Sequence, residues 1–149
     1  MKYSQANMGR IFIIRLEDGE IIHEKIEEFA EDKGIKSAAL IAVGGVDKVS
    51  KLIVGPEDGR AKVINPMEFI LSEVHEIVGT GTLFLDEDEK PVLHMHISCG
   101  RRAETITGCV REGVKTWHIL EIVLFELVGG EPVRVLDEKT GFKFLEPNG

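Results

Sequence analysis

The sequence predicts a single α+β domain in which a mainly antiparallel β-sheet packs against one principal helix. The chain has 149 residues and 43% hydrophobic content, which is enough for one core. Only one segment shows helical spacing, whereas about eight segments rich in β-branched and aromatic residues are typical of strands. Parallel strands would need repeated crossover helices, so we expect antiparallel pairing.

The first third of the chain predicts a strand, the helix and a second strand. Residues 10–16 are β-branched and aromatic, which indicates a buried first strand. In residues 20–33 the helical face comprises Ile22, Ile26, Phe29 and Ala30. Gly34 supplies a C-terminal stop. Small residues in 37–43 predict a strand ending at Gly44-Gly45, where the backbone can adopt a positive φ or approach another group closely.

The middle of the chain predicts further strands. A strand is expected over 48–54, whereas 63–72 is ambiguous because Pro66 removes a hydrogen-bond donor. Residues 73–85 have a strand pattern, with Gly79 and Gly81 as bulge positions. After a charged turn, we expect that strand to pair as a hairpin with the segment that begins at Pro91.

Two more strands, over 105–110 and 114–127, complete the predicted sheet. The glycine pair Gly129-Gly130 and the turn Thr140-Gly141 then break the C-terminus into short hairpin pieces. We therefore expect one domain over 1–149, with a core at about 8–128 and a C-terminal hairpin extension over 129–149.

His94 and His96 are separated by one residue in an apolar strand. Side chains alternate along a strand, so both imidazoles lie on one face. Leu93, Met95 and Ile97 then point into the core. Cys99 shares their parity and is expected to be a small buried residue.

Cys109 is expected to lie opposite His96. In a hairpin around residues 100–105, facing residues have numbers that sum to roughly 205, with Cβ atoms about 5 Å apart. Two imidazoles and a thiolate leave one position open on tetrahedral zinc, as in catalytic or exchangeable sites. The alternative is that His94 and His96 form a half-solvated or subunit-facing surface.

Other residues are weaker candidates for chemistry. Glu121 lies on an otherwise apolar strand face, where a charged group needs a partner. It could act as a general base, as a carboxylate that orients a histidine, or as an acid that is paired within a subunit interface. His75 could serve as a spare metal ligand, although a lone histidine is more often a surface or hydrogen-bonded residue. Arg101 and Arg102 could hold a small anion above the ion, or form a solvated hairpin tip.

Charge, hydrophobic pattern and cysteine content limit the partners and the cellular compartment that the sequence predicts. The net charge of −8 opposes phosphate backbones, so bare DNA is disfavoured. No apolar stretch is long enough to span a bilayer, and residues 1–7 lack the apolar core of a secretion signal. The two cysteines form no disulfide framework, which fits a reducing compartment, so we expect a cytoplasmic protein without a membrane partner.

The chain resembles the PPC domain, the plants-and-prokaryotes conserved domain, over nearly its whole length. The resemblance depends on the opening strand and helix and on Phe29-Ala30, Gly34-Ile35, Gly44-Gly45-Val46, Gly79, His94-Met95-His96, Gly108-Cys109 and Glu121-Ile122-Val123. It implies an antiparallel sheet packed on a helix, a homotrimer, and an association with DNA. Prokaryotic relatives typically have Gly-His where this chain has Gly108-Cys109, and plant relatives carry AT-hooks, which this chain lacks.

Three functions remain open. The first is a homotrimeric binding module with a divalent-metal site, zinc being the preferred ion, at His94, His96 and Cys109, with a DNA-associated or regulatory role implied by the resemblance. The second is a metal-dependent hydrolase or lyase in which Glu121 moves a proton. The third is a purely architectural trimer whose histidines only pack.

Overall fold

The computed structural model describes residues 1–147 and has one helix and ten strands. They are β1 (Asn7–Leu16), α1 (Ile22–Lys33), β2 (Ser37–Val46), β3 (Lys51–Pro56), β4 (Pro66–Ile70), β5 (His75–Asp86), β6 (Pro91–Arg101), β7 (Glu104–Glu112), β8 (Thr116–Val128), β9 (Val133–Leu136) and β10 (Lys143–Glu146). The predicted α+β class is therefore confirmed. Within the described residues, no helix has the length and apolar character that a membrane span requires.

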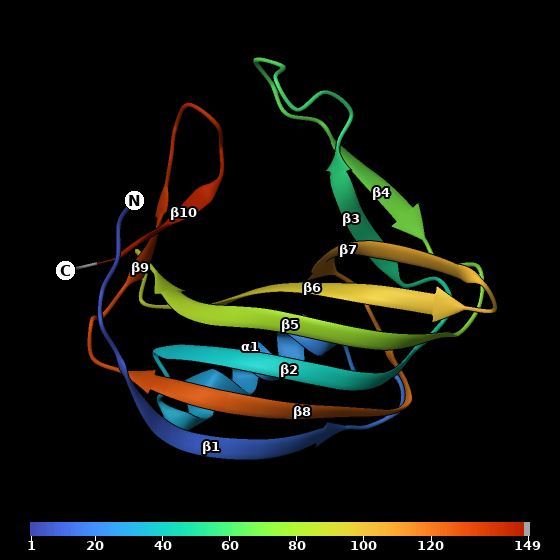
Figure 1. Cartoon of the computed structure of the whole chain (residues 1–149), viewed down its shortest axis with the longest axis horizontal. Helices are drawn as coiled ribbons and strands as arrows, with labels where there is room; N and C mark the ends of the chain where they lie inside the picture. The colour runs from blue at the N-terminus through green and yellow to red at the C-terminus, as the bar shows by residue number, and fades with distance from the viewer. Residues whose placement is uncertain (148–149) are drawn as a thin grey trace.

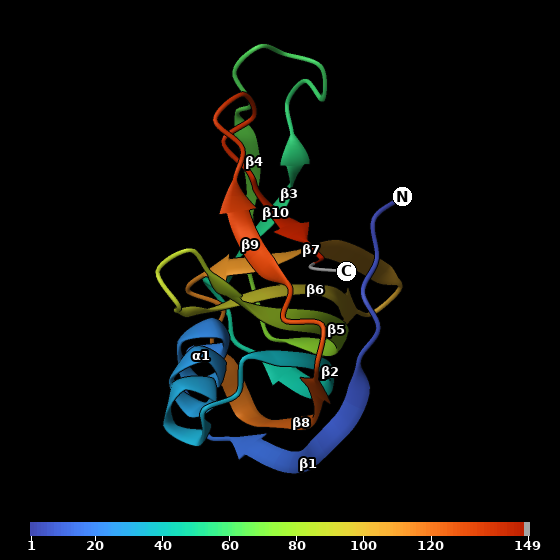
Figure 2. The same ribbon diagram turned by 90° about the vertical axis from the view of Figure 1, so that its left-hand side faces the viewer.

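The strands form one sheet in the order β1-β8-β2-β5-β6-β7-β3-β4. All neighbours along this order are antiparallel. β9 adds a short parallel contact to β5, and β10 pairs with β9. Figure 1 shows α1 behind the sheet, and both views show the β3–β4 and β9–β10 hairpins projecting beyond β6 and β7 (Figures 1 and 2).

The helix forms as its apolar spacing predicts, although it begins at Ile22 and not at residue 20. Ile22, Ile26 and Ala30 are its buried residues. Gly34 ends the helix in the left-handed conformation at φ 62°, and its N–H group donates to the carbonyl groups of Ala30 and Glu31.

The inner face of the sheet forms the core against the helix. Leu93, Met95, Ile97 and Cys99 are all buried on this face of β6, which confirms the predicted parity. The prediction that Gly79 and Gly81 are bulges is wrong, because β5 and β6 pair without a register shift. A Cβ atom at either glycine would lie within 3 Å of Met95 side-chain atoms, so the two glycines make room for this side chain.

Several strand ends differ from the predictions. β2 continues through Gly44 and Gly45 to Val46, with its bulge against β8 at these glycines. The sequence suggested that glycine would end the strand, but pairing with both β5 and β8 carries the backbone onward. β4 resolves the ambiguous segment as a short exposed strand that starts at Pro66. The C-terminal hairpin pieces are β9 and β10.

Candidate metal centre

Two neighbouring strands hold the candidate ligands. His94 and His96 lie on the exposed face of β6, opposite the buried Met95. The β6–β7 register pairs His96 directly with Cys109, as the hairpin count predicts. The preceding Gly108 allows close packing, since a Cβ atom there would be 2.8 Å from the Cβ atom of Leu52. The sheet thus delivers three donor groups to one side of the β6–β7 hairpin.

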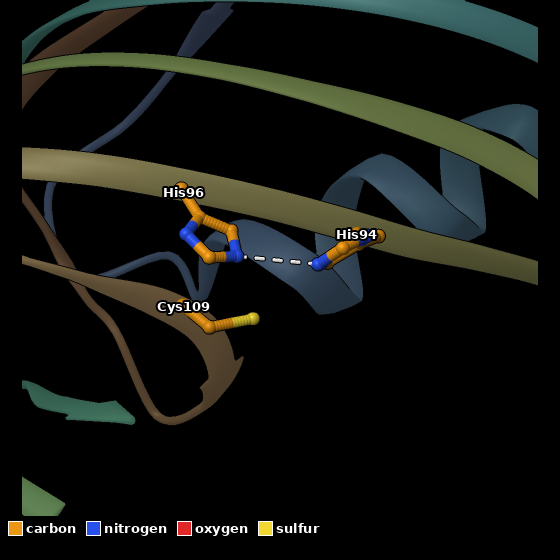
Figure 3. A group of neighbouring side chains, drawn as sticks. All are labelled: His94, His96 and Cys109. Carbon is orange, nitrogen blue, oxygen red and sulfur yellow. Dashed lines mark hydrogen bonds between the residues drawn. The ribbon is translucent and has the colours of Figure 1, made fainter. Parts of the chain in front are cut away.

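The side chains converge on a common point (Figure 3). The Nε2 atoms of His94 and His96 are 3.2 Å apart, within hydrogen-bonding distance. One ligand atom from each of His94, His96 and Cys109 lies within 4.8 Å of the others. Tetrahedral zinc, with Zn–N of about 2.1 Å and Zn–S of about 2.3 Å, needs ligand separations of about 3.4 to 3.6 Å. Small side-chain rotations would therefore complete such a site.

Positive charges surround these ligands. The Nε–H group of Arg111 donates to the Cys109 sulfur at 3.4 Å and so places a cation beside it. Burial lowers the pKa of His94, and the charges of Arg134, His96 and Arg111 lower this pKa further. A lowered pKa keeps the imidazole neutral, which is the form that coordinates metals.

The structure does not bring the other predicted site residues to this cluster. His75 begins β5 and its Nδ1 atom lies 2.7 Å from the Glu73 carbonyl oxygen, whereas His96 pairs with Thr80 in the middle of that strand. Arg101 donates to the Val74 carbonyl at 2.9 Å, at the opposite end of β6 from His94. Neither residue is positioned to serve the three ligands.

Arg102 and Glu121 also lie elsewhere. Arg102 is exposed in the β6–β7 turn at a φ of 57°. Glu121 is exposed on β8, paired in register with Arg15 and Val43, and β2 and β5 lie between β8 and the histidine strand. In the single chain, Glu121 is therefore not the desolvated acid that its strand parity suggested.

Sequence reasoning missed the cations next to the site. Arg111 follows Cys109 by two residues, so strand alternation could have placed both on one face. Arg134 reaches the site from β9, whose parallel pairing with β5 brings Arg134 opposite Asp86. No local signal predicts that contact, because it joins distant segments through a short strand.

A comparison with known protein families identifies the family of this chain. The sequence profile of the Plants and Prokaryotes Conserved (PCC) domain matches residues 3–128. The chain belongs to the PCC domain family. This is the plants-and-prokaryotes conserved domain, also abbreviated PPC, so the predicted resemblance is confirmed. A comparison with curated proteins gave no match.

Solved structures share the fold of this PCC domain. A metal-containing protein of Archaeoglobus fulgidus is 29% identical, with a TM-score of 0.82 over 97% of this chain and 99% of that one. A plant- and prokaryote-conserved protein of Pyrococcus horikoshii is 24% identical, with a TM-score of 0.83 over 98% and 97%. A candidate DNA-binding protein of Bacteroides thetaiotaomicron is 18% identical, with a TM-score of 0.75 over 98% and 100%.

Proposed function

We propose that this PCC domain is a binding module that holds one divalent metal ion, zinc by preference, between His94, His96 and Cys109. The observation that carries the proposal is the approach of their three ligand atoms to within 4.8 Å of one another. Imidazole and thiolate ligands together favour zinc over magnesium or calcium, which prefer oxygen ligands. The similar Archaeoglobus fulgidus protein is itself described as metal-containing.

Three protein ligands would leave one coordination position for an exchangeable group. A metal-dependent hydrolase or lyase would also need a group that moves protons. Glu121, the candidate for that role, is exposed and is separated from β6 by two strands. The geometry therefore argues against Glu121 as the proton-transfer group of such an enzyme, and we prefer the binding module.

Metal content tests this proposal. Tag-free protein loaded with zinc and then desalted should retain about one ion per chain, measured by inductively coupled plasma mass spectrometry. His94→Ala should lose that ion, whereas His75→Ala is the matched control and should retain it. Less than about a tenth of an ion in the wild-type protein, at neutral pH where histidine ligands are deprotonated, would refute the site.

We also propose that the module assembles with copies of itself as a homotrimer through the outer face of the sheet. A cross-strand row on this face runs from β1 to β7 and consists of Ile13, Val123, Ile41, Thr80, His96 and Cys109. Ile13 is 88% exposed in the single chain, and Ile41, Val43 and Val78 are also exposed. A contiguous exposed apolar patch is typical of a protein–protein interface.

Native mass spectrometry tests the assembly. Wild-type protein should have three times the mass of one chain, and Ile13→Asp should lower this mass, because a buried charge without a partner is costly. Val63→Asp is a suitable control, since Val63 is exposed in the loop between β3 and β4 and away from the face. A monomeric wild-type protein at micromolar concentration would contradict the proposal.

DNA is the less favoured partner. The Bacteroides thetaiotaomicron protein is described as a candidate DNA-binding protein, but its 18% identity to this chain supports a shared fold alone. The net charge of −8 here opposes the electrostatic attraction on which DNA affinity depends. A regulatory role through protein or small-molecule partners is therefore preferred over direct contact with DNA.

A further inference from the structure

A cavity of about 690 Å³ opens beside His94. The pairing of β7 with β6 ends at Val110 and Met95, which leaves the β6 edge free near Leu93. The N–H group of Leu93 instead donates to Glu27 of α1 at 2.8 Å. The cavity occupies this opening, and the β9–β10 hairpin supplies its remaining wall.

Arg134 is the most unusual group in the wall of the cavity. It is only 6% exposed. Its Nη2 atom donates to the Thr82 hydroxyl at 3.1 Å, and its guanidinium lies 5.6 Å from the centre of the Phe84 ring. Its buried Nε–H group has no hydrogen-bond partner, and no carboxylate of residues 1–147 forms an ion pair with Arg134. Buried charges are normally paired, so this guanidinium group is suited to bind an anion.

Neighbouring groups strengthen this argument. Arg111 also lines the cavity, beside Cys109. His23 lines it too, and its Nδ1 atom is buried without a hydrogen-bond partner among the described residues. Glu27 is the acid in the wall, and one of its carboxylate oxygens is used by the Leu93 amide. Lys143 is neutralised separately by Asp86 at 2.7 Å. Among residues 1–147, no carboxylate therefore forms an ion pair with the guanidinium group of Arg111 or of Arg134.

The remaining wall is largely apolar. Phe142, Phe144 and Leu145 of the C-terminal hairpin line the cavity together with Val92 and Val110. An inorganic ion would leave this surface unused, whereas an organic anion would cover it. The pocket thus combines cations at one position with space for an apolar group.

We propose that this cavity binds a small organic oxyanion, whose oxygen atoms pair with Arg134 and Arg111 and whose apolar part lies against Phe142 and Phe144. A carboxylate and a phosphate monoester share the chemistry that a guanidinium group recognises. The proposed contact between the anion and Arg134 does not depend on a bound metal ion. A second contact, from the anion to the open coordination position of the metal beside His94, rests on the proposed function.

Calorimetric titration of metal-free protein with phenylacetate, phenyl phosphate and inorganic phosphate tests the Arg134 site. At least one aromatic anion should bind more tightly than inorganic phosphate, and the better of the two identifies the class of oxyanion. Arg134→Gln should weaken this binding by about 10- to 100-fold, since hydrogen bonds to charged groups are the stronger kind. Arg60→Gln is the control, because Arg60 lies in the exposed loop between β3 and β4.

The outcomes are separable. Absence of binding by all three anions at millimolar concentration, or equal affinity in wild type and Arg134→Gln, would overturn the site. Arg111→Gln provides a second variant if Arg134→Gln fails to fold, and it should also weaken binding. Repeating the titration on zinc-loaded protein tests the metal contact. If the zinc-loaded protein binds the anion with unchanged affinity, the proposed contact between anion and metal is wrong, but the Arg134 site is not affected. If zinc does not bind at all, the measurement of metal content will show it.

Discussion

Replacing Cys109 by alanine is expected to weaken zinc binding by more than about 100-fold, because loss of a supporting residue around a metal ligand already costs about 10- to 100-fold. The thiolate is the softest donor of the three and the one that distinguishes this site from a set of histidines alone. Competition with a chromophoric chelator would measure the change in affinity. His94 and His96 would remain, so weak binding should persist.

Absorption spectroscopy of the cobalt-substituted protein provides a second test of Cys109 as a ligand. Wild-type protein with Co²⁺ should show a thiolate-to-cobalt charge-transfer band, and Cys109→Ala should lose it. Cys99→Ala is the matched control: Cys99 is buried on the core face of the same sheet, and burial raises the pKa of its thiol to about 11. A charge-transfer band that survives in Cys109→Ala but disappears in Cys99→Ala would contradict the assigned ligand set.

Gly44→Ala should destabilise the fold by roughly 3 kcal/mol or more, from overpacking together with backbone strain. Gly44 has a φ of 146°, and an added Cβ atom would lie 2.3 Å from the carbonyl oxygen of Ile119. This oxygen belongs to the backbone of β8, which pairs with β1 on one side and β2 on the other, so it cannot move aside alone. Urea unfolding at a fixed protein concentration would measure the loss.

Gly59→Ala provides the comparison for this substitution. A Cβ atom at Gly59 would meet no heavy atom of the described residues within 4 Å, and Gly59 is exposed in a loop. Its effect should stay within about 0.5 kcal/mol. Equal unfolding midpoints for the two variants would show that the close approach of β2 to β8 does not constrain position 44.

The parts of the fold that could be predicted are those encoded locally. The helix follows from apolar spacing and a glycine stop, and the pairing of His96 with Cys109 follows from counting across one short hairpin. The functions of glycines were harder to predict. Gly79 and Gly81 resemble bulge positions in sequence, but their purpose is to accommodate Met95 from the neighbouring strand.

The candidate site was predictable to a similar extent. Strand parity predicts that His94, His96 and Cys109 lie together, as they do. Arg134 reaches this cluster from β9, a strand whose contact with β5 depends on packing between distant segments. The sequence offers Arg101 and Arg102, which follow the histidines closely in the chain, either as anion contacts or as a solvated hairpin tip. Arg101 is the last residue of β6 and donates to the Val74 carbonyl group, and Arg102 lies in the turn that follows, so both are remote from His94.

The shallow attachment of the β9–β10 hairpin has a dynamic consequence. β9 pairs with β5 through only Leu85↔Val133 and Asp86↔Arg134, whereas β5 and β6 pair along their whole length. Segments with few hydrogen bonds to the rest of a protein open at a lower free energy than the global unfolding reaction. Side-chain contacts also hold the hairpin: Arg134 to Thr82, the Leu136 amide to Glu87, and Lys143 to Asp86. We expect the hairpin to detach at a lower free energy than global unfolding, and this opening would give a bulky solute a route into the cavity.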